Sequence, residues 1–277
     1  MFLAFWAWLK AYKNNLLAVF SFSVSYWLVY YAAELKPYSM DLLVVGIFCL
    51  LLGYKRGLIF FLPLLLFFSY AAIFVFWIPA YNLFMLWRKD KSTLPSLITY
   101  ILVSMAAFIS AYSIDWRFGL SQSCLFDYWR DYFICSDSPY CFIKSFTEGL
   151  RNMVAWPFGN NRLSLRLASV FIPFFLLGIF LSFRSFLKEA KSGIKTLESF
   201  GAIIFIELFI LGLFKKYPFT GERVTLFFMP VVFFMIVKGI ELFKRYKTLY
   251  FSLLTVYTLF LSYSGFNSLL AFLRLYR

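Results

Sequence analysis

Long apolar runs separated by short polar segments fill most of this sequence, and this pattern restricts the chain to a membrane. Hydrophobic residues make up 62% of its 277 residues and charged residues only 14%, a balance that water-soluble domains do not sustain. A bilayer core about 30 Å thick requires every spanning segment to satisfy its own backbone hydrogen bonds, as a helix of about 20 apolar residues does. The sequence therefore predicts an all-α integral membrane protein, with residues 1–277 forming one polytopic domain.

We expect a helical bundle of about nine spans. The apolar segments are 16–32, 42–53, 57–68, 69–87, 94–114, 163–183, 196–214, 224–237 and 248–264. Segments 42–53 and 57–68 are short for independent spans, which favours a helical hairpin there. Residues 1–9 are also apolar and look like the end of a helix whose beginning is missing. Pro173 and Pro230 lie within apolar segments, where we expect them to kink their helices.

The net charge and the absence of histidine restrict the partners and the chemistry that we expect of this protein. The chain carries 27 Lys and Arg against 13 Asp and Glu, and these basic residues punctuate apolar runs. The expected partners are therefore membrane lipid and lipid phosphates, not nucleic acid. With no His in the chain, acid–base chemistry falls to carboxylates, Lys or Tyr, and we expect no metal site and no cofactor.

Basic clusters predict the orientation, because they concentrate in cytoplasmic loops. If the spans alternate, five clusters fall on one side: Lys10 with Lys13, Lys55 with Arg56, 88–91, 184–195 and 238–247. The other side then holds 34–41, 215–223 and a longer extracytoplasmic loop, 115–162. That loop contains Cys124, Cys135 and Cys141. These form either one disulfide of undetermined pairing or three packed thiols.

The two polar islands 34–41 and 215–223 supply the candidate site. Lys36, Arg223, Lys215 and Lys216 are candidates for holding a substrate phosphate, since cations pair strongly with phosphate where water is scarce. The alternative is that they snorkel to the membrane surface. We favour a functional role for Arg223, whereas snorkelling suits Lys215 and Lys216 at least as well.

Two acids of the first island are the catalytic candidates. Glu34 suits a general base towards an acceptor hydroxyl, and equally an ion-pair partner of Lys36. For Asp41 a catalytic role is weighed against an N-cap of a helix starting at Leu42, and the N-cap is favoured. Farther along, Glu207 lies mid-span, where we expect it to be protonated or paired with Arg162 or Arg166.

Aromatic side chains near the islands are candidates for contact with a sugar or a lipid chain. The four such residues are Tyr38, Tyr128, Trp129 and Tyr217. In a chain with 24% aromatic residues, an interfacial aromatic belt explains any single one equally well.

Four ordered stretches resemble bacterial membrane proteins of the GT-C glycosyltransferase superfamily, the group that includes protein mannosyltransferases and the aminoarabinose transferase. The stretches are YYAAELKPYSMDLLVVGIFCLLL (30–52), FSYAAIFVF (68–76), FDYWRDYF (126–133) and YPFTGERVTLFFMPVVFFMIVKGIE (217–241). The resemblance implies a multi-pass enzyme of the bacterial inner membrane that uses a polyprenyl-phosphate-linked sugar on the extracytoplasmic face.

The resemblance also implies a gap. Such enzymes carry an essential acid in the first outer loop, ahead of the region matched here, and Glu34 is not its positional equivalent. We therefore expect the C-terminal portion of such an enzyme, incomplete or dependent on a partner chain that supplies the missing part. The alternative is a non-catalytic membrane protein that binds lipid phosphate or a partner subunit.

Overall fold

The computed structural model describes residues 2–12, 15–25, 28, 38–51, 58–116, 127–155, 158, 166, 168–220 and 225–275, and every regular element in these ranges is helical. Five helical segments are long and apolar enough to cross a membrane. These are Tyr70–Lys89, Lys91–Ile114, Ser169–Glu189, Leu226–Arg245 and Lys247–Asn267. The structure thus confirms an all-α fold and agrees with a multi-pass membrane protein. The described residues contain five candidate spans, where about nine were expected for the whole chain.

The remaining predicted segments are shorter or irregular helices. The N-terminal helices are α1 (Phe2–Ala11), α2 (Leu16–Val24) and α4 (Tyr38–Leu51). A 3₁₀ segment, η1 (Leu58–Phe67), follows and contains Pro63. Proline removes a backbone donor and clashes with the preceding α-helical turn, so the predicted span 57–68 is not a regular α-helix.

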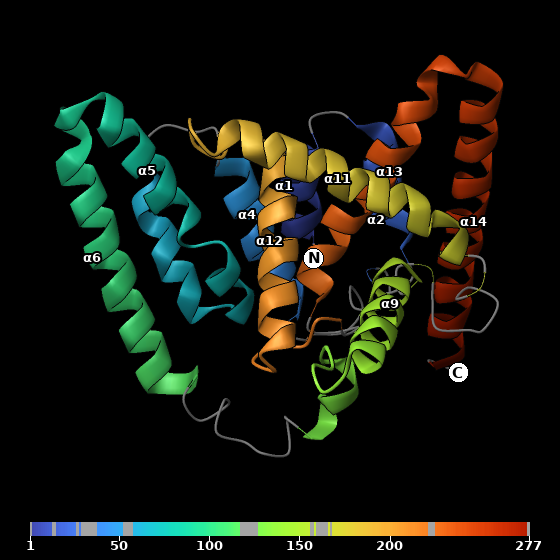
Figure 1. Cartoon of the computed structure of the whole chain (residues 1–277), viewed down its shortest axis with the longest axis horizontal. Helices are drawn as coiled ribbons and strands as arrows, with labels where there is room; N and C mark the ends of the chain where they lie inside the picture. Colours follow the sequence, from blue (N-terminus) through green and yellow to red (C-terminus); the bar gives the residue numbers. More distant parts are fainter. Residues whose placement is uncertain are drawn as a thin grey trace.

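The described ends of the longer helices separate into two groups (Figure 1). The helices concerned are α5 (Ile78–Lys89), α6 (Leu94–Ala111), α11 (Ile172–Glu189), α12 (Leu197–Leu213), α13 (Met229–Glu241) and α14 (Lys247–Leu275). The connections 90–93, 190–196 and 242–246 form what we call the upper end. Segments 127–138 and 214–220 form the lower end.

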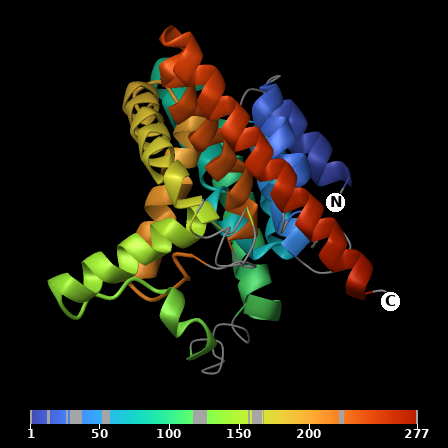
Figure 2. The same cartoon turned by 90° about the vertical axis from the view of Figure 1, so that its right-hand side faces the viewer.

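The lower end carries one further helix, α9 (Pro139–Ala155), which projects sideways from the bundle in Figure 2. Its Leu150, Met153 and Val154 are buried, while Lys144 and Glu148 are exposed. Such an amphipathic helix suits the membrane surface. Its Phe146 ring stacks on Phe219, with the centroids 5.7 Å apart, so the helix is fixed to the segment that follows α12.

The centre of the bundle is the crossing of α11 and α13. A Cβ added to Gly178 of α11 would overlap the backbone of Met235, and one added to Gly239 of α13 would overlap the backbone of Phe174. The two glycines therefore let the helix backbones touch, which is how helices associate where lipid removes the hydrophobic driving force. Around this crossing lies one large apolar core.

Two expected kinks are absent. Pro173 and Pro230 each occupy the first turn of their helices, α11 and α13, directly after a short 3₁₀ turn. Proline is favoured there because the first backbone N–H groups of a helix have no intrahelical partner. These prolines start helices and do not bend them.

A smaller apolar cluster lies to one side of the main core. It consists of Leu83 of α5 with Leu97 and Tyr100 of α6, and Ile59 and Phe60 of η1 pack against it. Tyr100 donates its hydroxyl hydrogen to the carbonyl of Phe76, 2.5 Å away. We refer to α5, α6 and η1 around this cluster as the lateral unit.

The glycine crossing gives a first prediction. Gly178→Ala and Gly239→Ala should each lower the free energy of unfolding by about 1–3 kcal/mol, the usual cost of overpacking, because the obstructing atoms are backbone and cannot rotate away. Unfolding in a denaturing detergent, followed by circular dichroism, measures the loss. Gly46→Ala is the control, since its added Cβ would meet only side chains, the nearest at 3.0 Å. Equal stability of all three variants would contradict a backbone-to-backbone crossing.

Candidate functional site

The lower end brings together parts of the chain that are distant in sequence. Asp41 at the start of α4 accepts a hydrogen bond from the hydroxyl of Ser69, with Oγ and Oδ1 2.6 Å apart. Phe74, in the short 3₁₀ segment η2 (Tyr70–Phe74), makes an edge contact with Tyr217 at 4.9 Å between ring centroids. The segment 69–74 therefore touches one residue from each polar island, in support of a common location for the islands.

The outer loop joins the same cluster through backbone hydrogen bonds. Phe219 N–H donates to the Tyr132 carbonyl at 3.0 Å, and Ile134 N–H donates to the Gly212 carbonyl at 3.2 Å. A disulfide between Cys135 and Cys141 closes the loop just before α9. Of the two alternatives for the three cysteines of this loop, the structure has the disulfide, and Cys124 lies outside the described residues.

Asp41 does not have the role that the sequence favoured. Helix α4 begins at Tyr38, so Asp41 lies within its first turn and is not an N-cap before Leu42. Its half-buried carboxylate suits the positive end of the helix dipole and is held by Ser69. The prediction failed because the helix starts earlier than the apolar run does.

Two of the four phosphate candidates are described, and both are exposed just after α12. Lys215 lies 3.9 Å from Asp137 of the outer loop, an exposed ion pair that contributes little stability. Its φ of 54° is left-handed. Lys216 N–H donates to the carbonyl of Leu211 and Lys215 N–H to that of Gly212, so the helix ends in a Schellman motif with Lys where glycine is usual.

Four other candidate site residues lie wholly or partly outside the residues that the structure describes. Glu34, Lys36 and Arg223 are among the residues that the structure leaves undescribed, and of Tyr38 only the backbone is described. Their convergence therefore stays a prediction. Tyr128 and Trp129 are described and form an edge contact at 4.8 Å. Trp129 also contacts Tyr132, the residue that joins the loop to Phe219.

Glu207, in the middle of α12, has a different partner from the expected one. The Trp77 indole N–H donates to Glu207 Oε1 at 2.5 Å, across 130 positions of sequence. Glu207 Oε2 is buried and has no hydrogen-bond partner among the described residues. Arg166 is exposed and makes no ion pair in the described part of the chain, while Arg162 lies outside it. Glu207 is thus a structural contact between α12 and the lateral unit.

Three partner residues escaped the sequence reasoning: Ser69 for Asp41, Asp137 for Lys215 and Trp77 for Glu207. Each pair joins segments far apart in the chain, and nothing in the local pattern marks one member for the other. The only available signal was that a buried acid requires some donor.

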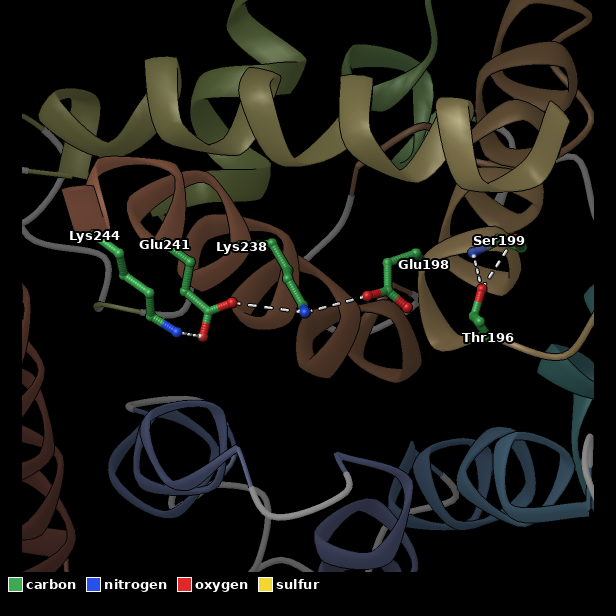
Figure 3. A network of polar contacts seen from close by, with 6 residues as sticks. All are labelled: Thr196, Glu198, Ser199, Lys238, Glu241 and Lys244. Carbon is green, nitrogen blue, oxygen red and sulfur yellow. Dashed lines mark hydrogen bonds and ion pairs between the residues drawn. The ribbon is translucent and has the colours of Figure 1, made fainter. Parts of the chain in front are cut away.

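The upper end contains an ordered polar network (Figure 3). Lys238 of α13 lies 3.3 Å from Glu198 of α12 and 3.6 Å from Glu241, which also pairs with Lys244 at 3.3 Å. The Thr196 side chain caps α12 by accepting from Ser199 N–H. The network fastens α13 to the start of α12, and its charges balance locally.

No protein family model, curated protein or solved structure matches this chain.

The Trp77–Glu207 pair gives a second prediction. Trp77→Phe should cost about 1–3 kcal/mol in unfolding free energy, because it leaves a buried acceptor without a donor. The double variant Trp77→Phe with Glu207→Leu should recover much of that loss, since removal of both partners leaves no orphan. Detergent unfolding of the single and double variants measures the coupling. Additive losses from the two changes would mean that the hydrogen bond contributes nothing to stability.

Proposed function

We propose that this chain is a multi-pass protein of the bacterial inner membrane, related to glycosyltransferases of the GT-C superfamily, whose lower end binds a polyprenyl-phosphate-linked sugar. One observation carries the proposal. The four stretches that resemble the superfamily, 30–52, 68–76, 126–133 and 217–241, touch one another there. The contacts are Asp41 with Ser69, Phe74 with Tyr217, and Tyr132 with Phe219. A common site requires contacts of this kind.

Charge and cysteine chemistry support an extracytoplasmic lower end. The upper end carries the basic clusters 88–91, 184–195 and 238–247, which is typical of the cytoplasmic side. The lower end carries the disulfide Cys135–Cys141, and disulfides persist in oxidising compartments. These two independent signals agree on one orientation.

The described acids favour an incomplete or partner-dependent enzyme. Asp127, Asp131, Asp137 and Glu148 of the lower end are all exposed, and Asp41 is engaged by Ser69. A general base for sugar transfer needs to lie within hydrogen-bond reach of the acceptor. The acid that performs this step would come from Glu34 or from a partner chain.

The meeting of the four stretches at the lower end also supports the alternative function, a non-catalytic protein that binds lipid phosphate or a partner subunit. Such a protein needs cations and aromatic surface but no base. Lys215, Lys216, Tyr128 and Trp129 supply these at the lower end, whatever the state of the acids.

A transfer assay tests the enzymatic proposal. If a partner chain supplies the base, the purified chain alone should transfer little or no labelled sugar from a polyprenyl-phosphate donor. Addition of a segment bearing a span and an acidic outer loop should restore turnover. Strong turnover by the chain alone that is abolished by Glu34→Gln would contradict partner dependence and identify Glu34 as the base. If the chain binds the polyprenyl-phosphate-linked sugar but transfers none of it, with or without the added segment, the non-catalytic alternative is favoured.

Thiol labelling tests the orientation. In intact cells, Lys216→Cys should react with a membrane-impermeant maleimide, whereas Lys191→Cys should react only after the membrane is opened. Both positions are exposed, so accessibility within the protein does not differ between them. Both variants are made in a Cys124→Ser background, in which Cys49 is buried and Cys135 and Cys141 are paired. That background without a new cysteine is the control. Labelling of Lys191→Cys in intact cells would reverse the orientation.

A further inference from the structure

The upper end contains a cavity that the proposed function does not use. Its volume is about 130 Å³, and its apolar wall comes from α4, η1 and α5, including Phe48, Leu62 and Leu86. Its polar side comes from the α11–α12 connection, through Ser192 and Lys195, and from Asn82 of α5. The cavity is smaller than the roughly 300–1,000 Å³ usual for drug-sized ligands, so it suits only part of a lipid, such as the phosphate and the adjoining segment of one chain.

The polar side is held rigidly. The Asn82 side-chain amide donates to the Ile194 carbonyl at 2.8 Å and its oxygen accepts from Ile194 N–H at 2.6 Å. Tyr81 donates to the Ala190 carbonyl. The Glu189 carboxylate accepts from the backbone N–H groups of Lys195 and Thr196, at 2.8 and 3.2 Å. The connection is therefore preorganised before any ligand arrives, which reduces the entropic cost of binding.

Lys195 is the lysine that lines the cavity, and it is one of several cations of the upper end without an ion-pair partner in the described part of the chain. Lys238 and Lys244 are neutralised by the carboxylates of Figure 3, and Lys91 lies over the Trp87 ring at 4.2 Å. Within the described part of the chain, no carboxylate lies in ion-pair range of the Lys195 ammonium. Glu189, the nearby acid, has one oxygen engaged by two backbone donors. Arg88, Lys89 and Lys191 add positive charge at the same end.

We infer that this cavity binds an anionic phospholipid. Lys195 and the Ser192 hydroxyl would contact the phosphate, and the acyl chain would lie against Leu86 and the apolar wall. Lys195 is exposed, and an ammonium beside a phosphate forms a charge-assisted hydrogen bond that is stronger than a neutral one. Basic sites between membrane helices on the cytoplasmic side are suited to acidic lipids. The site is separate from the lower end, and the inference rests on the proposed orientation but not on the sugar-transfer function.

Calorimetric titration of the full chain in a neutral detergent tests this site. The probes are short-chain phosphatidylglycerol, short-chain phosphatidylcholine and glycerol 3-phosphate. We expect phosphatidylglycerol to bind about tenfold more tightly than phosphatidylcholine, and glycerol 3-phosphate to bind far more weakly because it lacks the chains. Equal affinity for both lipids, or equal affinity for glycerol 3-phosphate and phosphatidylglycerol, would overturn the assignment.

Matched variants locate the effect. Lys195→Glu should abolish the preference for phosphatidylglycerol, whereas Lys191→Glu makes the same charge change on the same connection, outside the cavity lining, and should retain it. Ser192→Trp should fill the cavity and weaken binding of both lipids. If Lys195→Glu fails to fold, as shown by size-exclusion chromatography, Lys195→Gln replaces it and should reduce the preference. If Lys195→Glu and Lys191→Glu reduce the preference for phosphatidylglycerol equally, the lipid is attracted only by the charge of the surface, and the proposal is wrong.

Discussion

The close approach of α11 and α13 is the constraint on which the rest of the bundle depends. Gly178 and Gly239 face each other's helix backbones, and Gly201 of α12 meets Val231 and Met235 of the same α13 surface. In a membrane, apolar side chains gain little by leaving lipid for protein, so tight packing must supply the association energy. Three helices thus meet on small residues, and almost all of α13 is buried as a result.

Aromatic hydrogen-bond donors attach the other helices to this centre. Tyr12 donates to the Pro230 carbonyl at 3.0 Å, and Trp8 donates to the Leu42 carbonyl at 2.9 Å. Both acceptors lie within the first few residues of a helix. Trp77 and Glu207 make an equivalent link between α5 and α12. The high aromatic content of the chain therefore supplies apolar bulk and, at a few positions, the directional contacts that fix which helices are neighbours.

The sequence pattern was sufficient to predict the helical class of the protein and which described segments share an end of the bundle. Apolar runs and clustered charges are local properties of the sequence, so they can be recognised without the structure. The pattern predicted that 215–223 and the outer loop share one side, and Phe219 does bond to Tyr132. It was insufficient where long-range packing decides the outcome. Pro63 lies in a 3₁₀ segment, Pro173 and Pro230 begin helices, and Asp41 lies inside one. Neither the partner of Glu207 nor that of Lys215 follows from a local pattern.

The lateral unit has its own small core, and its polar attachments to the rest of the protein lie mainly on α5. Asn82 and Tyr81 attach α5 at the upper end, and Trp77 attaches its beginning to α12. Helix α6 contacts the bundle chiefly through α5 and η1, while Leu102, Met105 and Ile109 face outward. A helix with so few fixed partners opens at a lower free energy than the core does. Changes in bilayer thickness or lateral pressure would therefore be absorbed at α6, so the glycine-packed centre keeps its geometry in membranes of different composition.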